Sequence, residues 1–213
     1  MQPPYLTKLG RQPILLVALI FFSACSDSFE GSIRYETSLS GEGAEILEPL
    51  LRAQRLGFIL YQKGDHLRVE YPDRIIIVRY DQDSAFVIFP QDSSFIGFEL
   101  SRGDSLPTLS MQALPEKRQI VGYDCIAKRV EYAADGKSYA LTFWEAPALR
   151  PSMLAREKLP ILPLGVRIEG FPLRLESSIL GQSLTFIYEA VWVDRKRLSD
   201  DLFIVPLDFR KAK

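Results

Sequence analysis

Two cysteines and a single histidine are the side chains of this sequence best suited to covalent or metal chemistry. A zinc site needs three or four His, Cys or carboxylate ligands, and His66 and Cys125 lie far apart along the chain. The G-x-S-x-G turn that presents a nucleophilic serine in many hydrolases is absent. The sequence therefore predicts no catalytic residue, no metal site and no cofactor.

The remaining polar clusters have the composition of turns. Asp81-Gln82-Asp83 and Asp200-Asp201 carry the short acidic side chains that hydrogen-bond to turn backbone, and His66 begins a strand beside Lys63-Gly64-Asp65. The triplet Arg195-Lys196-Arg197 is expected to be a solvated turn, or to meet anionic lipid headgroups. Trp144 and Trp192 are expected in the core or at its rim.

Cys25 stands at the junction between apolar and polar sequence. Residues 1–13 contain Lys8 and Arg11 and no acid, and residues 14–22 read ILLVALIFF. That run is too short for a transmembrane helix, which needs about 20 apolar residues. A basic start, a short apolar run and small residues before a cleavage point are the parts of a secretory signal peptide, here residues 1–24.

The sequence Phe22-Ser23-Ala24-Cys25 resembles the bacterial lipobox, although Phe22 departs from the usual leucine. The resemblance implies cleavage before Cys25, a diacylglyceryl group on its thiol and an acylated amine. More than one acyl chain anchors a protein firmly, whereas one alone is marginal. Two alternatives stay open: a secreted protein with an unmodified cysteine, or an uncleaved anchor.

The processed chain, residues 25–213, has the composition of one globular domain. Removing Lys8 and Arg11 leaves 24 basic and 27 acidic residues, a net charge of −3, without the basic surplus of a nucleic-acid-binding domain. If Cys25 carries lipid, Cys125 has no partner thiol. Such a cysteine is either a small buried hydrophobic residue, which we expect, or a reactive thiol.

Alternating apolar and polar residues dominate the mature sequence and predict nine or ten strands. A hairpin is expected around Lys63-Gly64-Asp65, and another around Ala133–Lys137 with Gly136 in the left-handed region. The fold class is therefore mainly β: a strongly curved antiparallel sheet or open, incomplete β-barrel with one or two short helices.

Three segments interrupt the strand pattern. Residues 44–56 predict a short helix, with Pro49 in its first turn or breaking it. Residues 101–116 predict a loop because they contain Gly103, Pro107 and Pro115. Four prolines give residues 146–165 the composition of a Pro-rich connection within the single domain, with at most one helical turn near Met153–Glu157.

The segment Phe171–Val193 predicts a central hairpin of the sheet. Even spacing places Phe186, Tyr188 and Trp192 on one face of the second strand. If that face is core, Phe186→Ala is expected to cost about 3–5 kcal/mol.

Short motifs along the mature chain resemble a family of uncharacterised bacterial lipoproteins. They are F-x-G-x-I-x-Y at Phe29–Tyr35, K-G-x-x-x-R at Lys63–Arg68, G-Y-x-C at Gly122–Cys125 and F-x-x-P at Phe203–Pro206. That family is similar to the LolA/LolB-like lipoprotein carriers, which implies an open β-barrel whose apolar hollow holds acyl chains. The sparse helix here departs from that pattern, and no lipid-binding residue can be matched individually.

These observations predict a non-enzymatic lipoprotein of the cell envelope. It would be held in the outer membrane, facing the periplasm or the cell surface, by acyl groups on Cys25. Its expected ligand is apolar or amphiphilic, such as a lipid or a lipoprotein acyl chain, and no nucleic acid is expected. The alternatives are an envelope protein-interaction module with a filled core and, less favoured, a hydrolase. A cavity would favour the carrier and a filled core the module.

We expect Cys25 to be acylated in cells. Labelled palmitate should enter the wild-type protein and be lost in Cys25→Ser, because the thiol is the attachment point. A wild-type protein that takes no label and leaves the membrane in a salt wash would contradict acylation.

Overall fold

Twelve strands form one open, strongly curved sheet in the computed structural model, which describes residues 28–53, 57–100, 108–163, 165–180 and 183–212. The expected fold class is therefore confirmed, and the sheet does not close into a barrel. The strand order is β12-β6-β5-β4-β3-β2-β1-β11-β10-β9-β8-β7, so β1 joins the first part of the chain to the last. All described pairs are antiparallel except β12 with β6.

The strand bounds are as follows: β1 Gly31–Ser40, β2 Gly57–Lys63, β3 His66–Glu70, β4 Ile75–Arg79, β5 Ser84–Phe89, β6 Ser94–Glu99, β7 Thr108–Ile120, β8 Tyr123–Ala134, β9 Lys137–Ala146, β10 Phe171–Ile179, β11 Thr185–Arg195 and β12 Arg210–Lys211. Helix α1 spans Ala44–Ala53, and short 3-10 turns occur at Tyr80–Gln82, Pro90–Asp92 and Asp200–Phe203. The helix continues through Pro49, which neither begins nor ends it. No helix in the described ranges is long and apolar enough to cross a membrane.

Turn chemistry explains several connections. Asp135 and Gly136 both have positive φ, which is the geometry of a two-residue hairpin turn whose twist matches that of the strands. The left-handed conformation was expected for Gly136 and not for Asp135. The β4–β5 and β5–β6 connections share one design, a 3-10 turn followed by a left-handed residue, at Asp83 and Ser93. This repeated design was not expected from the sequence.

The prediction of a loop at residues 101–116 is wrong for residues 108–116, because these residues belong to β7, which begins at Thr108. Residues 101–107 lie outside the described residues. Pro115 lies in β7, which is an edge strand of the sheet, at a point where the register with β8 shifts between Ala113 and Lys117. Edge strands and bulges are the positions at which a sheet tolerates proline, because proline has no amide hydrogen to donate.

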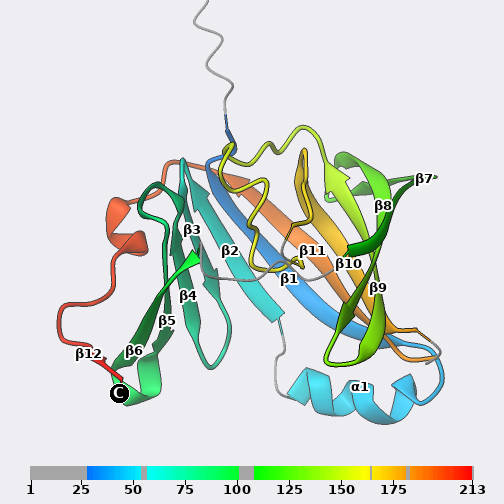
Figure 1. Cartoon of the computed structure of the whole chain (residues 1–213), viewed down its shortest axis with the longest axis horizontal. Helices are drawn as coiled ribbons and strands as arrows, with labels where there is room; N and C mark the ends of the chain where they lie inside the picture. Colours follow the sequence, from blue (N-terminus) through cyan, green and yellow to red (C-terminus); the bar gives the residue numbers. More distant parts are fainter. Residues whose placement is uncertain (1–27, 54–56, 101–107, 164, 181–182, 213) are drawn as a thin grey trace, which may run out of the picture.

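The concave face carries the larger core. Alternate residues of β1–β3 point into it, including Ile33, Leu60 and Leu67, none of which is exposed. The Pro-rich residues 147–170, described except for residue 164 and here called the crossing segment, pass across this face (Figure 1). The crossing segment is therefore more than a connection, because it places five large aliphatic side chains in the core: Leu149, Leu159, Leu162, Val166 and Ile168.

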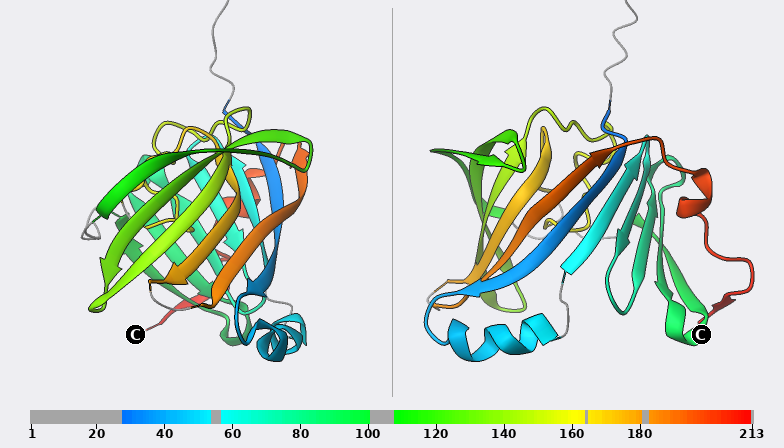
Figure 2. Two further views of the ribbon diagram at one scale, coloured as in Figure 1. Left: turned by 90° about the vertical axis from the view of Figure 1, so that its right-hand side faces the viewer. Right: turned by 180° about the vertical axis from the view of Figure 1, so that it is seen from behind.

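The convex face is covered over β2–β6 by residues 196–209, the C-terminal segment, which runs outside the sheet (Figure 2). Leu198 and Phe203 pack there on Ile77 and Ile88, and all four side chains are buried. The Arg68 guanidinium also donates a hydrogen bond to the Leu202 carbonyl oxygen at 2.8 Å. The convex face of this half of the sheet is thus covered around Ile77 and Ile88, whereas Ile96 and Phe98 of β6 are 46% and 49% exposed.

Cys125 is a free, buried cysteine on β8, as expected from the sequence. Its side chain is 1% exposed, and burial raises the pKa of the thiol to about 11. Because the thiolate is the reacting form, both its burial and its raised pKa suppress its reactivity.

We expect a maleimide reagent to label Cys125 only after unfolding. Labelling of native protein should stay slow from pH 7 to pH 10, since the thiol is protonated below its pKa, and become fast in denaturant. Fast labelling of the native protein at pH 7 would show instead an accessible thiol.

Candidate functional site

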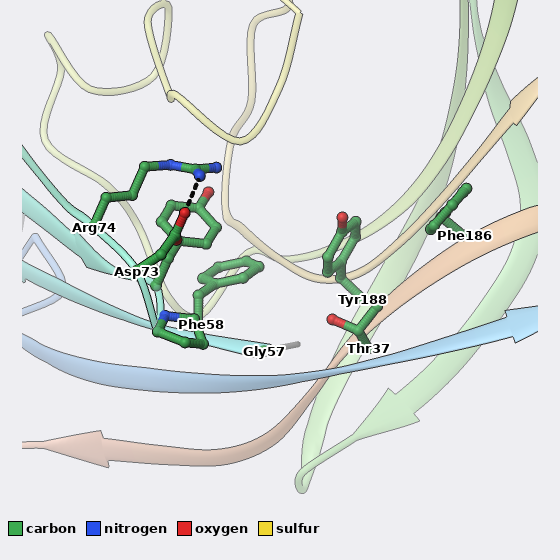
Figure 3. A pocket seen from close by; sticks show the side chains of 9 residues that line it. Thr37, Gly57, Phe58, Asp73, Arg74, Phe186 and Tyr188 are labelled. Carbon is green, nitrogen blue, oxygen red and sulfur yellow. Dashed lines mark hydrogen bonds and ion pairs between the residues drawn. The ribbon is translucent and has the colours of Figure 1, made fainter. Parts of the chain in front are cut away.

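An aromatic pocket of about 390 Å³ opens on the concave face, at the end of the sheet where α1 lies (Figures 1 and 3). That volume falls within the range of roughly 300–1,000 Å³ found for small-molecule sites. Its lining comes from β1, β2, β11 and the turn between β3 and β4: Thr37, Gly57, Phe58, Tyr71, Pro72, Asp73, Arg74, Phe186 and Tyr188. We call this cavity the aromatic pocket.

The floor of the aromatic pocket is a packed set of rings. Phe58 stacks on Tyr35 with ring centroids 4.4 Å apart and also contacts Tyr71 at 5.3 Å and Tyr188 at 5.7 Å. Tyr35 is fixed from beneath by its hydroxyl, which donates to the Pro172 carbonyl oxygen at 2.7 Å. Ring packing of this kind holds a preformed apolar surface.

The mouth of the aromatic pocket is polar. Residues 71–74 make a tight turn closed by a hydrogen bond from the Tyr71 amide to the Arg74 carbonyl oxygen at 2.8 Å. The Arg74 guanidinium pairs with Asp73 at 2.9 Å and lies 4.7 Å from the centre of the Tyr71 ring. An apolar interior beside a charged rim suits an amphiphilic molecule, with its chain inside and its polar end at the turn.

Burial raises the pKa values of the Tyr71 and Tyr188 hydroxyls, and the nearby Arg74 charge acts in the opposite direction. Both hydroxyls are therefore protonated at neutral pH and offer neutral hydrogen-bond donors. Among the residues that the structure describes, the lining contains no histidine, cysteine or lysine.

A second cavity of about 240 Å³ adjoins the first, and Tyr188 lines both. Its other walls include Leu141 and Leu175 of the sheet and residues Pro160–Pro163 of the crossing segment. The concave face thus has two regions. The crossing segment covers the part nearer β8–β10 and leaves the 240 Å³ cavity beneath it, whereas the aromatic pocket opens where the segment does not reach.

A β-bulge changes which residues share the aromatic pocket. Tyr35 pairs with Ala190 and Arg34 pairs with Trp192, so Val191 is an extra residue that shifts the alternation of β11. Phe186 and Tyr188 therefore face the concave side, while Trp192 faces the convex side beneath Arg34. The expectation that all three rings share one face is wrong for this reason, whereas the central position of the β10–β11 hairpin is confirmed.

The structure separates the other residues singled out from the sequence. His66 contacts Asp81 at 3.3 Å and packs on Phe203 on the convex side, away from the aromatic pocket. Asp83 pairs with Lys158, and the pKa of Asp200 is lowered by its hydrogen bond and ion pair with Lys63. No group of three metal-ligating side chains occurs in the described part of the chain.

Trp144 lies in the core, as expected. It is 4% exposed, and the Arg118 and Arg174 guanidinium groups lie 4.9 Å and 5.6 Å from its ring centre. Trp192, in contrast, is 42% exposed on the convex face and belongs to neither core cluster of the described residues. Cys25 lies outside the described residues, so its acylation stays a prediction. Sequence reasoning missed Phe58, Tyr71 and Arg74, although the short Tyr71-Pro72-Asp73-Arg74 turn between two strands is a visible signal.

Comparisons with known proteins identify no family for this chain. No protein-family model and no curated protein matches the chain. Among solved structures, a domain assigned to an outer membrane lipoprotein-sorting protein of Vibrio parahaemolyticus is similar over 81% of this chain and 89% of its own. The sequence identity is 10% and the TM-score is 0.31, values that support no argument about activity.

Phe186 is 41% exposed, so we revise the expected cost of Phe186→Ala to about 1 kcal/mol, because half of its surface is already in water. Phe143, on the concave side of β9 and 0% exposed, provides the contrast, and Phe143→Ala should cost about 3–5 kcal/mol. Urea unfolding of both variants measures the difference. Equal losses would mean that Phe186 belongs to the closed core.

Proposed function

We propose that this chain is a lipid-anchored, non-enzymatic protein of the outer membrane that binds an amphiphilic ligand in the aromatic pocket. The observation that carries the proposal is the open volume of about 390 Å³, lined by rings and bordered by Arg74. The ligand class is a molecule with an aliphatic chain and an anionic or polar head, such as a lipid or the acyl part of a lipoprotein.

The physical gain comes from burying the aliphatic chain. Each CH₂ group removed from water contributes about 0.8 kcal/mol, so a stretch of about ten carbons gains about 8 kcal/mol. Association costs at least about 4 kcal/mol, so the chain alone supports only weak binding. A contact between the head and Arg74 is therefore needed for micromolar affinity.

The anchor supports an envelope location. The junction of residues 14–25 carries the features of a lipoprotein signal, and Ser26 gives no obvious retention signal for the inner membrane. The proposed residence is therefore the outer membrane, on the side facing the periplasm or the cell surface.

A second candidate is a protein-interaction module of the envelope. The observation in its favour is the crossing segment, which fills much of the concave face with the chain's own side chains. In that case the aromatic pocket would be an incidental gap and the functional surface would lie elsewhere. The two candidates differ in whether an aliphatic ligand binds saturably.

We expect a fluorescent fatty acyl probe to bind the chain begun at Ser26, which carries neither the signal sequence nor an acyl group of its own. Binding should saturate with a dissociation constant in the micromolar range and be competed by unlabelled lipid. Phe186→Ser should weaken it about tenfold, which corresponds to about 1.4 kcal/mol of lost contact.

Trp192→Ser is the matched control, because Trp192 lies on the same strand with nearly the same exposure, 42% against 41%, but on the other face. Its affinity for the probe should change less than twofold. Absence of saturable binding, or an equal loss in both variants, would remove the carrier function and favour the interaction module.

A further inference from the structure

The chain enters the sheet at a fixed point. The Phe29 amide donates a hydrogen bond to the Arg150 carbonyl oxygen at 2.6 Å, and its ring packs edge-on against Phe171 with centroids 5.4 Å apart. The Phe29 side chain is 0% exposed. The first described residues are therefore tied to the start of the crossing segment, at the upper end of the sheet in Figure 1.

This point lies close to the proposed lipid attachment. Phe29 lies only four positions after Cys25, and a fully extended chain of four residue steps spans about 14 Å. If Cys25 is acylated, as the proposed function requires, this end of the sheet stays within that distance of the membrane surface. The short tether therefore limits which face of the domain can meet the bilayer.

Two exposed apolar side chains lie beside the same point. Met153 is 79% exposed and Leu154 is 47% exposed, three and four residues after Arg150. Their turn is closed by hydrogen bonds from the Ala155 amide to the Ser152 hydroxyl and from the Arg156 amide to the Ser152 carbonyl oxygen, both at 3.2 Å. We call these two side chains the Met153–Leu154 tip.

Basic side chains gather near the chain start. Arg195 lies 5.9 Å from the centre of the Phe29 ring and donates to the Ala148 carbonyl oxygen, and the side chains of Arg150, Lys196 and Arg197 are also exposed. Acids are present as well: Asp194 pairs with Lys196, Glu30 accepts a hydrogen bond from the Leu198 amide, and Glu157 is exposed three residues after Leu154. Exposed apolar residues among basic ones suit an anionic lipid surface.

We infer that the Met153–Leu154 tip and the basic residues near the chain start rest on the bilayer that holds Cys25. The domain then stands on its anchoring membrane with the aromatic pocket at the far end. Arg195 lies nine positions after Phe186 along β11, and at about 3.3 Å per residue this places the pocket mouth roughly 30 Å from the membrane-facing end. Figure 2 shows α1, beside the pocket, at the end of the sheet opposite the chain start.

This orientation has a consequence for the ligand. A pocket that faces away from the anchoring bilayer receives its ligand from the aqueous side, from a soluble carrier or a partner protein. It cannot extract lipid directly from the membrane in which the protein is anchored.

The test uses the full, acylated chain in vesicles of phosphatidylethanolamine and phosphatidylglycerol that contain a doxyl-labelled quencher lipid. An environment-sensitive thiol fluorophore is placed at Met153→Cys and, as the matched control, at Ile46→Cys on α1. The two positions have similar exposure, 79% and 71%, and the buried Cys125 does not compete for the label. The expected result is a blue-shifted emission at position 153 with at least threefold stronger quenching than at position 46.

Three outcomes would overturn the inference. Stronger quenching at position 46 would place the pocket end on the membrane, and equal or absent quenching at both positions would mean that the tip is not seated in lipid. A chain that fails to sediment with the vesicles would remove the anchor and, with it, both the orientation and the proposed lipid-anchored function. Sedimentation is measured separately, so failure of the anchor is distinguished from failure of the orientation alone.

Discussion

The apolar concave face of an open sheet is the constraint on which the rest of this structure depends. A closed barrel covers its own interior, whereas an open sheet of twelve strands needs another part of the chain to exclude water. The crossing segment does this with five aliphatic side chains and almost no regular secondary structure. Its prolines limit the conformations of the unfolded segment and so reduce the entropy lost on ordering it.

A buried ion pair holds the C-terminal end of the crossing segment in place. The Glu145 carboxylate, which is 0% exposed, accepts hydrogen bonds from the Glu169 and Gly170 amides and pairs with the Lys128 ammonium at 2.6 Å. A buried carboxylate is tolerated only when its oxygens are satisfied in this way. The same contacts satisfy two backbone amides at the point where an irregular segment becomes strand β10.

The aromatic pocket follows from the same constraint. The crossing segment covers the concave face near β8–β10 and leaves the surface near the β3–β4 turn open. The two ends of the domain therefore differ. One end carries the chain start and the Met153–Leu154 tip, and the other carries the pocket and α1. A carrier or a receiver of amphiphiles benefits from this separation, because anchoring and ligand exchange then occupy different ends of one rigid sheet.

Many features of this protein could be predicted from residues that lie close together in the sequence. Alternation predicted the strands, Gly136 predicted a hairpin with a left-handed residue, and the assignment of Cys25 to lipid predicted a free Cys125. These features depend on neighbours along the chain, so the sequence displays them directly. The lipobox-like junction at Cys25 is read in the same way.

Tertiary structure decided what depends on contacts between distant residues. The bulge at Val191 moves Trp192 to the convex face, and no local pattern marks it because it is set by the pairing with β1. The prolines of residues 146–165 predicted irregular structure, but only the uncovered sheet made that segment part of the core. The aromatic pocket joins Phe58, Tyr71 and Phe186 from three separate parts of the chain, and its existence depends on where the crossing segment stops. Empty volume is a property of packing, which a one-dimensional pattern does not record.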